Sequence, residues 1–319
     1  MENKSNYIPE NANDSCPGPK SELAGKSKNC EGCPNKGMCS TGEGIEEDPS
    51  LDQVRKRLQN VKNIILVLSG KGGVGKSSIA SQLALTLSKV HDSKYQVGLL
   101  DIDICGPSIP RMLNLENQEV HQSNDGWTPV YYEDNLAVMS IGFLLSNNKD
   151  AVIWRGPKKN GLIKQFLTDV CWDDLDYLII DTPPGTSDEH ISVVQYLSKA
   201  NVLGSLIVTT PQEISLLDVR KELSFCIKTN LNILGVIENM SGFTCPNCKC
   251  DTEIFSPDTG GALKMCKEFN VDLITKIPID IELLKSCDKG KCYYEVYPDK
   301  TTSKSFKSIV DLIEKKSIN

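Results

Sequence analysis

The sequence has few of the features that a nucleic-acid or membrane partner requires. It carries 42 acidic against 35 basic residues, a net charge of −7, whereas binding to phosphate backbones needs a basic surface. No apolar run approaches the roughly 20 residues that span a membrane. The first residues, MENKSNYIPENAND, have neither the hydrophobic core of a secretion signal nor an arginine-rich transit pattern. We therefore expect a cytoplasmic protein that binds neither nucleic acid nor membrane.

Histidine is also scarce, whereas cysteine is abundant. The three histidines lie far apart, at positions 91, 121 and 190, so a metal site in this chain has to rely on sulfur. Thiols stay reduced in the cytoplasm, and thirteen cysteines is an odd number that a fully paired disulfide framework would not give. The cysteines therefore favour metal ligation or redox chemistry over disulfides.

Composition divides the chain into a cysteine-rich segment over 1–50 and a larger domain over 51–319. The first segment has five prolines and very few large apolar side chains, so by itself it cannot bury enough surface to fold. Ligand bonds to a metal would replace the missing core. A short helix is expected over 48–62, at the start of the larger domain.

The larger domain alternates apolar strands with helices. Strands are predicted at 64–69, 96–101, 136–141, 176–181, 206–210 and 233–239. Helical patterns lie between them, for example at 76–90, 158–170, 188–199 and 213–228. This order predicts a mostly parallel sheet that is covered on both faces. The expected fold class is a doubly wound α/β architecture.

The stretch SGKGGVGKSS, residues 69–78, follows the first predicted strand and precedes a helix. It fits the phosphate-loop pattern G-x-x-x-x-G-K-[ST], although a plain glycine-rich turn is the alternative. Glycines let consecutive backbone N–H groups surround a β-phosphate, while the lysine meets the β- and γ-phosphates and the serine hydroxyl binds Mg²⁺. The predicted nucleotide-binding residues are Gly70, Lys71, Gly72, Gly73, Val74, Gly75, Lys76, Ser77 and Ser78.

Lys71, near the start of this loop, is not part of the general pattern. The sequence K-G-G-x-G-K-[ST] resembles the deviant P-loop ATPases, which include the MinD, ParA, nitrogenase iron-protein and Mrp families. The resemblance implies that Lys71 reaches across a dimer interface and supplies positive charge as the γ-phosphate of the partner's ATP leaves. ATP would then hold two subunits together until it is hydrolysed.

Two strand-end aspartates match the same families. The resemblance implies that Asp103, in DIDICGPS, positions the attacking water, and that Asp181, in LIIDTPPGT, holds Mg²⁺ through water. Capping of a strand end is the alternative, and it suits Asp101 better than Asp103 or Asp181. The implied catalytic residues are Lys71, Lys76, Asp103 and Asp181.

Three further positions carry roles that the resemblance implies. Gly185 suits a hinge that senses the γ-phosphate. Asn239, in VIENMS, and Asp280, in IPID, occupy segments that contact adenine in Mrp-type proteins.

Four cysteines of the first segment, Cys16, Cys30, Cys33 and Cys39, form the pattern C-x13-C-x2-C-x5-C. A [4Fe–4S] cluster takes four thiolates around a small volume, and zinc also takes four. Spacing alone does not choose between them. Zinc knuckles usually pair two C-x2-C units, so the single unit here mildly favours a cluster.

A second set, Cys245, Cys248 and Cys250, lies in GFTCPNCKC. Two thiols in C-P-x-C cannot complete a four-ligand site. They are a redox pair, half of a zinc site completed by distant cysteines, or half of a site completed by a second copy, and Cys250 either assists or stands nearby. The third alternative agrees with a lysine that acts across a dimer. The remaining cysteines are expected to be packing residues: Cys105, Cys171, Cys226, Cys266, Cys287 and Cys292.

Taken together, the four-cysteine leader, the deviant P-loop and the C-P-x-C loop resemble the larger scaffold ATPases of cytosolic iron–sulfur protein assembly, within the Mrp/NBP group. The leader is the specific part, because Mrp relatives and a smaller paralogue lack it. The resemblance implies a stable [4Fe–4S] cluster on Cys16, Cys30, Cys33 and Cys39. It also implies a labile cluster that bridges two subunits through Cys245 and Cys248 and is delivered to cytosolic and nuclear apoproteins. Implied partners are a second copy or the smaller paralogous ATPase, late-acting assembly factors and recipient apoproteins.

Two other classes of function are open at this stage. A MinD- or ParA-like positioning ATPase would share the phosphate loop, but it does not explain the leader. A zinc-stabilised nucleotide-dependent adaptor would explain the thiols without iron. The tail SFKSIVDLIEKKSIN has Phe306, Ile309, Val310 and Ile313 on one face, and we expect it to pack on the domain rather than on a membrane. The residues alone do not choose ATP over GTP.

Overall fold

The computed structural model describes residues 12–13, 16, 24–41, 48–145, 156–245, 248, 250–255 and 260–318. In these residues the main sheet has nine strands, in the order β10-β9-β8-β1-β7-β2-β6-β5, with β11 also paired to β9. The strands are β1 (Val61–Leu68), β2 (Val97–Asp101), β5 (Val130–Glu133), β6 (Leu136–Ser140), β7 (Leu175–Asp181), β8 (Val202–Thr209), β9 (Ile233–Thr244), β10 (Asp251–Thr252) and β11 (Leu273–Ile279). A separate hairpin pairs β3 (His121–Ser123) with β4 (Gly126–Thr128).

Most pairings in the main sheet are parallel. Strand β1 pairs in parallel with β7 and β8, β2 pairs with β6 and β7, and β9 pairs with β8 and β11. Only β5 and β10 join antiparallel among the described strands. This confirms the predicted doubly wound α/β fold. Because the carboxyl ends of parallel strands meet at one edge, the loops after β1, β2, β7 and β9 converge there.

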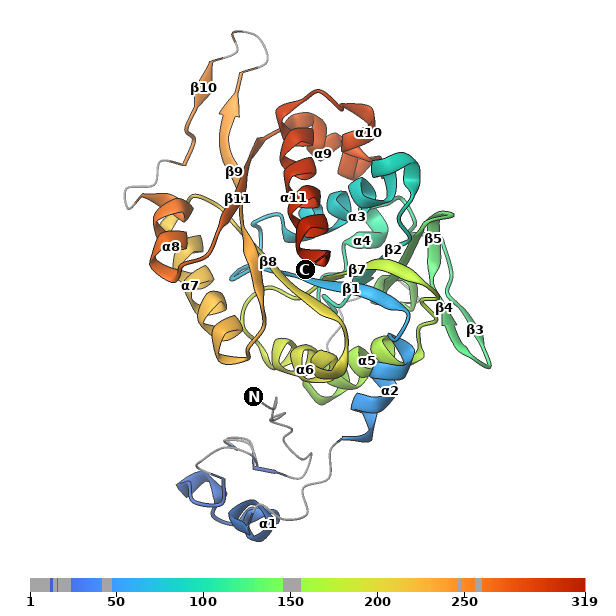
Figure 1. The fold of residues 1–319 in the computed structure, drawn as a ribbon, viewed down its shortest axis with the longest axis vertical. Coiled ribbons are helices and arrows are strands. Elements are labelled where there is room, and N and C mark those ends of the chain that lie inside the picture. Colours follow the sequence, from blue (N-terminus) through green and yellow to red (C-terminus); the bar gives the residue numbers. More distant parts are fainter. Residues whose placement is uncertain are drawn as a thin grey trace.

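Helices cover both faces of the sheet (Figure 1). One face packs against α2 (Pro49–Arg57), α5 (Gly156–Asp169), α6 (Asp188–Tyr196), α7 (Glu213–Lys228) and α8 (Gly261–Phe269). The other packs against α3 (Lys76–Ser93), α4 (Ile109–Met112), α9 (Ile281–Asp288), α10 (Tyr293–Val296) and α11 (Thr301–Ser317). Shorter elements are α1 (Lys36–Thr41) and the 3-10 turns η1 (Lys28–Cys30), η2 (Ile141–Phe143) and η3 (Leu197–Lys199).

The helix expected over 48–62 is wrong in its last third. Helix α2 ends at Arg57 and β1 begins at Val61, because the connecting residues already join the sheet: the N–H of Leu175 donates to the carbonyl oxygen of Asn60 at 3.2 Å. Strands β5, β10 and β11 were not predicted, since they lie at or near the edge of the sheet and carry polar residues.

The C-terminal helix α11 packs on the domain, as expected. Its four apolar residues Phe306, Ile309, Val310 and Ile313 are all 0% exposed and lie in the core against α3. Among the described residues, no helix has the length and apolar character that crossing a bilayer requires.

The two cysteine-bearing segments lie at opposite ends of the molecule in Figure 1. The hairpin of β9 and β10 extends beyond the sheet at the top of the view, whereas η1 and α1 lie below α2. The division into segments 1–50 and 51–319 stays a prediction.

Candidate functional site

The phosphate loop connects the end of β1 to the start of α3, and two of its glycines are required by close contacts. A Cβ on Gly70 would lie 2.5 Å from the carbonyl carbon of Asp218 on α7. Gly75 has φ +86°, and a Cβ there would lie 2.3 Å from Nδ2 of Asn239. That same Asn239 amide donates to the carbonyl oxygen of Val74 at 2.9 Å. Asn239, singled out from the sequence, therefore lies directly against the phosphate loop.

The backbone of this loop is free to bind an anion. In the described part of the chain, no backbone N–H of residues 72–75 donates to a backbone carbonyl, and a Cβ built on Gly73 would meet no heavy atom within 4 Å. The adjacent N-terminus of α3 adds a positive dipole end. These features fit the phosphates of a nucleotide.

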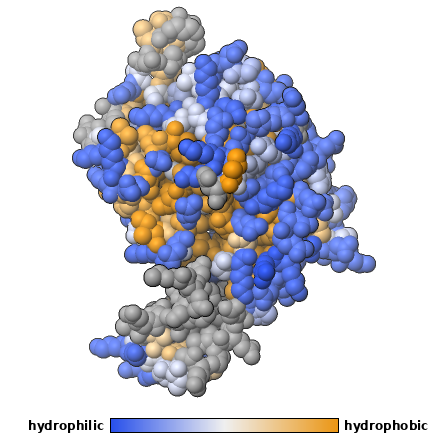
Figure 2. All heavy atoms as spheres, viewed as in Figure 1, coloured by the Kyte–Doolittle hydropathy of each residue, from blue (hydrophilic) through white to orange (hydrophobic). Residues whose placement is uncertain are grey.

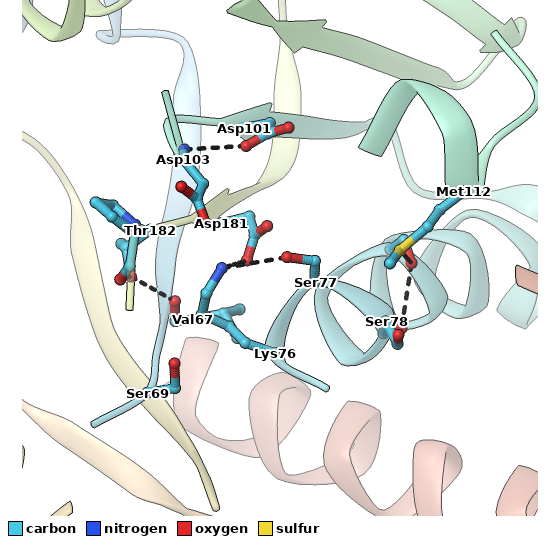
Figure 3. A network of polar contacts seen from close by, with 12 residues as sticks. Val67, Ser69, Lys76, Ser77, Ser78, Asp101, Asp103, Met112, Asp181 and Thr182 are labelled. Atoms are coloured by element: carbon cyan, nitrogen blue, oxygen red, sulfur yellow. Dashed lines mark hydrogen bonds and ion pairs between the residues drawn. The ribbon is translucent and has the colours of Figure 1, made fainter. Parts of the chain in front are cut away.

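Lys76, Ser77 and Asp181 meet at the start of α3 (Figure 3). The Lys76 ammonium lies 2.5 Å from Oδ1 of Asp181 and 3.2 Å from Oγ of Ser77. Lys76 is only 6% exposed and Asp181 is fully buried. The other oxygen of Asp181, Oδ2, is buried without a partner among the described residues. A buried carboxylate oxygen with no donor fits a water of a Mg²⁺ shell, because Mg²⁺ prefers oxygen ligands and retains several waters.

Asp101 is the last residue of β2, and Asp103 follows the strand beside this group (Figure 3). Asp101 accepts hydrogen bonds from the Ser140 hydroxyl at 2.9 Å and from the N–H of Asp103 at 3.0 Å, so it caps the strand end. Burial and the neighbouring Asp181 carboxylate raise the pKa of Asp101 to about 8. Burial also raises the pKa of Asp103, against the opposing effect of the Lys76 ammonium. Asp103 thus lies close to the ion pair, where its predicted role requires it.

The loop after β7 is held against the phosphate loop. The N–H of Gly185 donates to the carbonyl oxygen of Ser69 at 2.7 Å, and the Thr182 hydroxyl donates to the carbonyl oxygen of Val67 at 2.9 Å.

Sequence reasoning missed His190, whose Nδ1 accepts the N–H of Ser187 at 3.2 Å. Burial lowers the pKa of His190 to about 4, so the ring is neutral. The spacing of serine and histidine at a helix start, three residues apart as in a capping box, was the available signal.

Asp280 lies in a different environment from Asn239. Its carboxylate accepts the N–H of Glu282 at 2.9 Å, the Thr302 hydroxyl at 3.1 Å and the Tyr293 hydroxyl. It therefore caps α9 and ties that helix to α10 and α11. With Cys245 it also lines a cavity of about 370 Å³. Contact with adenine stays a prediction for this loop, and the Asp280 carboxylate is already engaged.

The side chain of Lys71 is half-buried and makes no hydrogen bond or ion pair within the described chain. A free Lys71 ammonium at the carboxyl edge of the sheet is compatible with its predicted action on the nucleotide of another subunit.

The leader thiols lie near one another. Cys30 is 6% exposed, and the N–H of Cys33 donates to its carbonyl oxygen at 3.3 Å. The Asn13 amide donates to the carbonyl oxygens of Asn29 at 2.8 Å and Glu31 at 3.2 Å. These hydrogen bonds connect the residue three positions before Cys16 to the turn η1 that contains Cys30.

Electrostatic interactions also indicate that the four leader thiols lie close together. Burial, followed by the charges of Cys16, Cys33 and Cys30, raises the pKa of Cys39. Among the described residues, no three cysteine, histidine or acidic side chains have the spacing that would hold a single metal ion. Four thiols are the donor set of a [4Fe–4S] cluster and equally of a zinc ion.

The second set of thiols lies at the tip of the β9–β10 hairpin. The N–H of Cys245 donates to the carbonyl oxygen of Cys250 at 3.0 Å, and the Cys250 thiol donates to the carbonyl oxygen of Cys248 at 3.8 Å. Hydrogen bonds from the N–H of Cys250 and from the thiols of Cys245 and Cys250 lower the pKa of Cys248. The tip therefore favours a thiolate, the form that binds metal, and Cys250 belongs to the same group of sulfurs.

Most of the other cysteines pack in the interior, as predicted, but Cys105 does not. Cys105 is exposed because it lies in the loop after β2 and not on a packed face. Cys171 is half-buried and its thiol donates to the carbonyl oxygen of Asp125 at 3.3 Å. The buried ones are Cys226, Cys266, Cys287 and Cys292.

Comparisons with known proteins show the family to which the chain is related. A family model described as ParA, NUBPL iron-transfer P-loop NTPase, matches residues 60–314. A cytosolic Fe-S cluster assembly factor NUBP1 homolog of Brugia malayi is 57% identical over 311 residues, covering 97% of this chain and 100% of the relative. A protein of the same name from Caenorhabditis briggsae is 54% identical over 310 residues, covering 97% and 98%.

Solved structures show the same fold. The nucleotide-binding protein in complex with ADP from Archaeoglobus fulgidus is 37% identical, with a TM-score of 0.64 over 76% of this chain and 92% of that one. The cell division ATPase MinD of Pyrococcus furiosus, at 21% identity and a TM-score of 0.55 over 80% and 99%, shares the fold alone. The chain belongs to the ParA family of NUBPL iron-transfer P-loop NTPases.

Proposed function

We propose that this protein is a cytoplasmic ATP-dependent scaffold that assembles [4Fe–4S] clusters and transfers them to cytosolic and nuclear apoproteins. The observation that carries the proposal is the presence, in one chain, of a phosphate loop with its Lys76–Asp181 ion pair and two separate groups of thiols. The two relatives named cytosolic Fe-S cluster assembly factors support it, because they align with nearly the whole chain.

In this proposal the nucleotide is ATP with Mg²⁺, bound by the backbone and side chains of residues 70–78. Lys76 leaves Asp181 to meet the β- and γ-phosphates, while Ser77 and Asp181 serve the metal ion. Asp103 positions the attacking water. Lys71 acts on the nucleotide of a second subunit, where its charge offsets that of the leaving phosphate.

The two groups of thiols have different roles. Cys16, Cys30, Cys33 and Cys39 hold a resident [4Fe–4S] cluster, which organises the leader through its ligand bonds. The hairpin thiols of two subunits hold the cluster that is being built, with Cys245 and Cys248 as ligands. Such a shared cluster is bound only while the interface is closed, so nucleotide state controls its release.

An exposed apolar surface supports the association of two chains. Figure 2 shows apolar side chains over the region where Figure 1 places α7 and α8. On α7, Ile214 is 61% exposed and Leu217 is 53% exposed, and the same helix packs against Gly70 beside Lys71. A second chain that receives Lys71 would cover these side chains. The partner is a second copy or a smaller paralogous ATPase.

Mössbauer spectroscopy of anaerobically reconstituted protein tests the proposal. The wild type is expected to show two [4Fe–4S] environments. Replacing Cys30 and Cys33 by serine removes one of them, and replacing Cys245 and Cys248 by serine removes the other. Stoichiometric zinc with no acid-labile sulfide in the wild type would favour the adaptor and overturn the scaffold.

A further inference from the structure

Strand β9 connects the phosphate loop directly to the hairpin thiols. The side-chain amide of Asn239 donates to the carbonyl oxygen of Val74 at 2.9 Å, and a Cβ on Gly75 would lie 2.3 Å from the same nitrogen. Further along the strand, the N–H of Cys245 donates to the carbonyl oxygen of Cys250 at 3.0 Å. Because Asn239 fits against the phosphate loop without spare room, a shift of that loop displaces it.

An irregular stretch of β9, the bulge at residues 240–242, separates the phosphate loop from the hairpin. The pairing with β11 moves from Asn239 to Phe243 on β9 while β11 advances by only two positions. Met240 has φ +56°, a left-handed conformation that is unfavourable for a residue other than glycine. Bulges change the direction of the strand that follows, and here β9 continues beyond the sheet into the hairpin (Figure 1).

Glu238, just before the bulge, fixes it to the rest of the domain. This side chain is only 2% exposed. Its Oε1 accepts the Ser241 hydroxyl at 2.5 Å and lies 3.1 Å from the Lys276 ammonium of β11. Its Oε2 accepts the N–H of Ala262, at the start of α8, at 3.1 Å. Hydrogen bonds to a charged acceptor are stronger than neutral ones, so Ser241 is held to a carboxylate that β11 and α8 keep in place.

We propose that Ser241 is a positioning residue, whose hydrogen bond to Glu238 transmits the nucleotide state from the phosphate loop to the hairpin thiols. A bulge that was free to bend would absorb a displacement of Asn239 before it reached the hairpin. The hydrogen bond joins the residues on either side of Asn239, so the displacement is passed on to the strand that carries the thiols. The role rests on the proposed function, because it requires a nucleotide in the phosphate loop and a cluster on the hairpin.

The test measures the loss of iron to a ferrous-iron chelator from full-length, anaerobically reconstituted protein, with ADP and with a non-hydrolysable ATP analogue. The iron of the hairpin is the part that is missing when Cys245 and Cys248 are both replaced by serine. In the wild type it is expected to leave roughly fivefold or more faster with ADP. Ser241→Ala should lower this ratio by about threefold or more, while the ATP affinity of the cluster-free protein stays unchanged. Ser241→Thr keeps the hydroxyl and should keep the ratio.

Hydrogen exchange in cluster-free, full-length protein gives a second readout that does not depend on iron. Binding of the ATP analogue should change the exchange of the amides in the β9–β10 hairpin of the wild type. The same analogue should leave these amides unaffected in Ser241→Ala, although it still protects the phosphate loop. A hairpin that responds equally in both proteins would contradict transmission through Ser241.

Ser305→Ala is the matched control, because the Ser305 hydroxyl donates to the carbonyl oxygen of Lys276 at 3.0 Å and so contacts β11 but not the bulge. Lys276→Gln, at a side chain that is 55% exposed, covers the case in which Ser241→Ala does not fold, and it should lower the ratio in the same direction. An unchanged ratio in Ser241→Ala, or an equal fall in Ser305→Ala, would overturn the role of Ser241 alone. Iron loss from the wild type that does not depend on the nucleotide would overturn nucleotide-controlled release as well.

Discussion

Glu222 lies on the buried face of α7, and replacing it with glutamine is expected to stabilise the protein at neutral pH. The side chain is 0% exposed, and neither carboxylate oxygen has a hydrogen-bond partner among the described residues. Burial alone raises the pKa of Glu222 from 4.5 to about 8. The folded protein therefore keeps a proton that the unfolded chain loses at a lower pH.

The sign and size of the effect follow from this difference in proton binding. Between pH 4.5 and about 8 the folded state binds more protons, so the free energy of unfolding falls as pH rises. One pKa unit corresponds to about 1.4 kcal/mol. The shift therefore removes about 3 kcal/mol of stability at pH 7 and about 5 kcal/mol above pH 8. Glutamine has nearly the same shape and no charge, so it removes this dependence.

Urea unfolding of the wild type, Glu222→Gln and Glu268→Gln between pH 5 and pH 8 measures the effect. The advantage of Glu222→Gln over the wild type should grow by about 3 to 4 kcal/mol across this range. Glu268, on α8, is 44% exposed in its side chain, and its substitution should give a nearly constant difference. Comparing variants cancels other titrating groups, such as Asp101. A difference for Glu222→Gln that does not change with pH would refute the reasoning.

Phe306→Ala empties a fully buried position between α11 and the core. It should lower the free energy of unfolding, measured in urea, by about 3 to 5 kcal/mol. A loss under 1 kcal/mol, roughly that of a surface change, would contradict the packing described for α11. Gly75→Ala places a Cβ at φ +86° and 2.3 Å from Nδ2 of Asn239, so binding of a fluorescent ATP analogue should be lost while the circular dichroism spectrum is retained. Unchanged affinity would show that the loop is not the nucleotide site. Lys71→Ala should lower turnover and leave ATP binding intact, and mixing it with Lys76→Ala should restore part of the activity. Failure of the mixture to recover would remove the support for action between subunits.

Local pattern was sufficient for much of the fold. Helix α7 was predicted at 213–228 and is found at Glu213–Lys228. Its apolar periodicity and the turn after it, at Asn230 with φ +55°, depend only on residues that are adjacent in the sequence, so both can be recognised without the tertiary structure. The phosphate loop was equally clear, since its glycines, lysine and serine are contiguous in the chain. The two sets of cysteines were also visible from spacing.

Contacts between distant segments were decided only by the tertiary structure. Strand-end capping by Asp101 was indicated by the sequence, but its partner Ser140 was not. The engagement of Asp280 by Tyr293 and Thr302 and the contact of Lys159 with Glu189 were not indicated either. Each of these contacts depends on which strands and helices become neighbours, and that is set by packing over the whole sheet. The residue types alone therefore determined that this chain has a phosphate loop and many thiols. The packing determined which carboxylates serve the nucleotide site and which hold the fold.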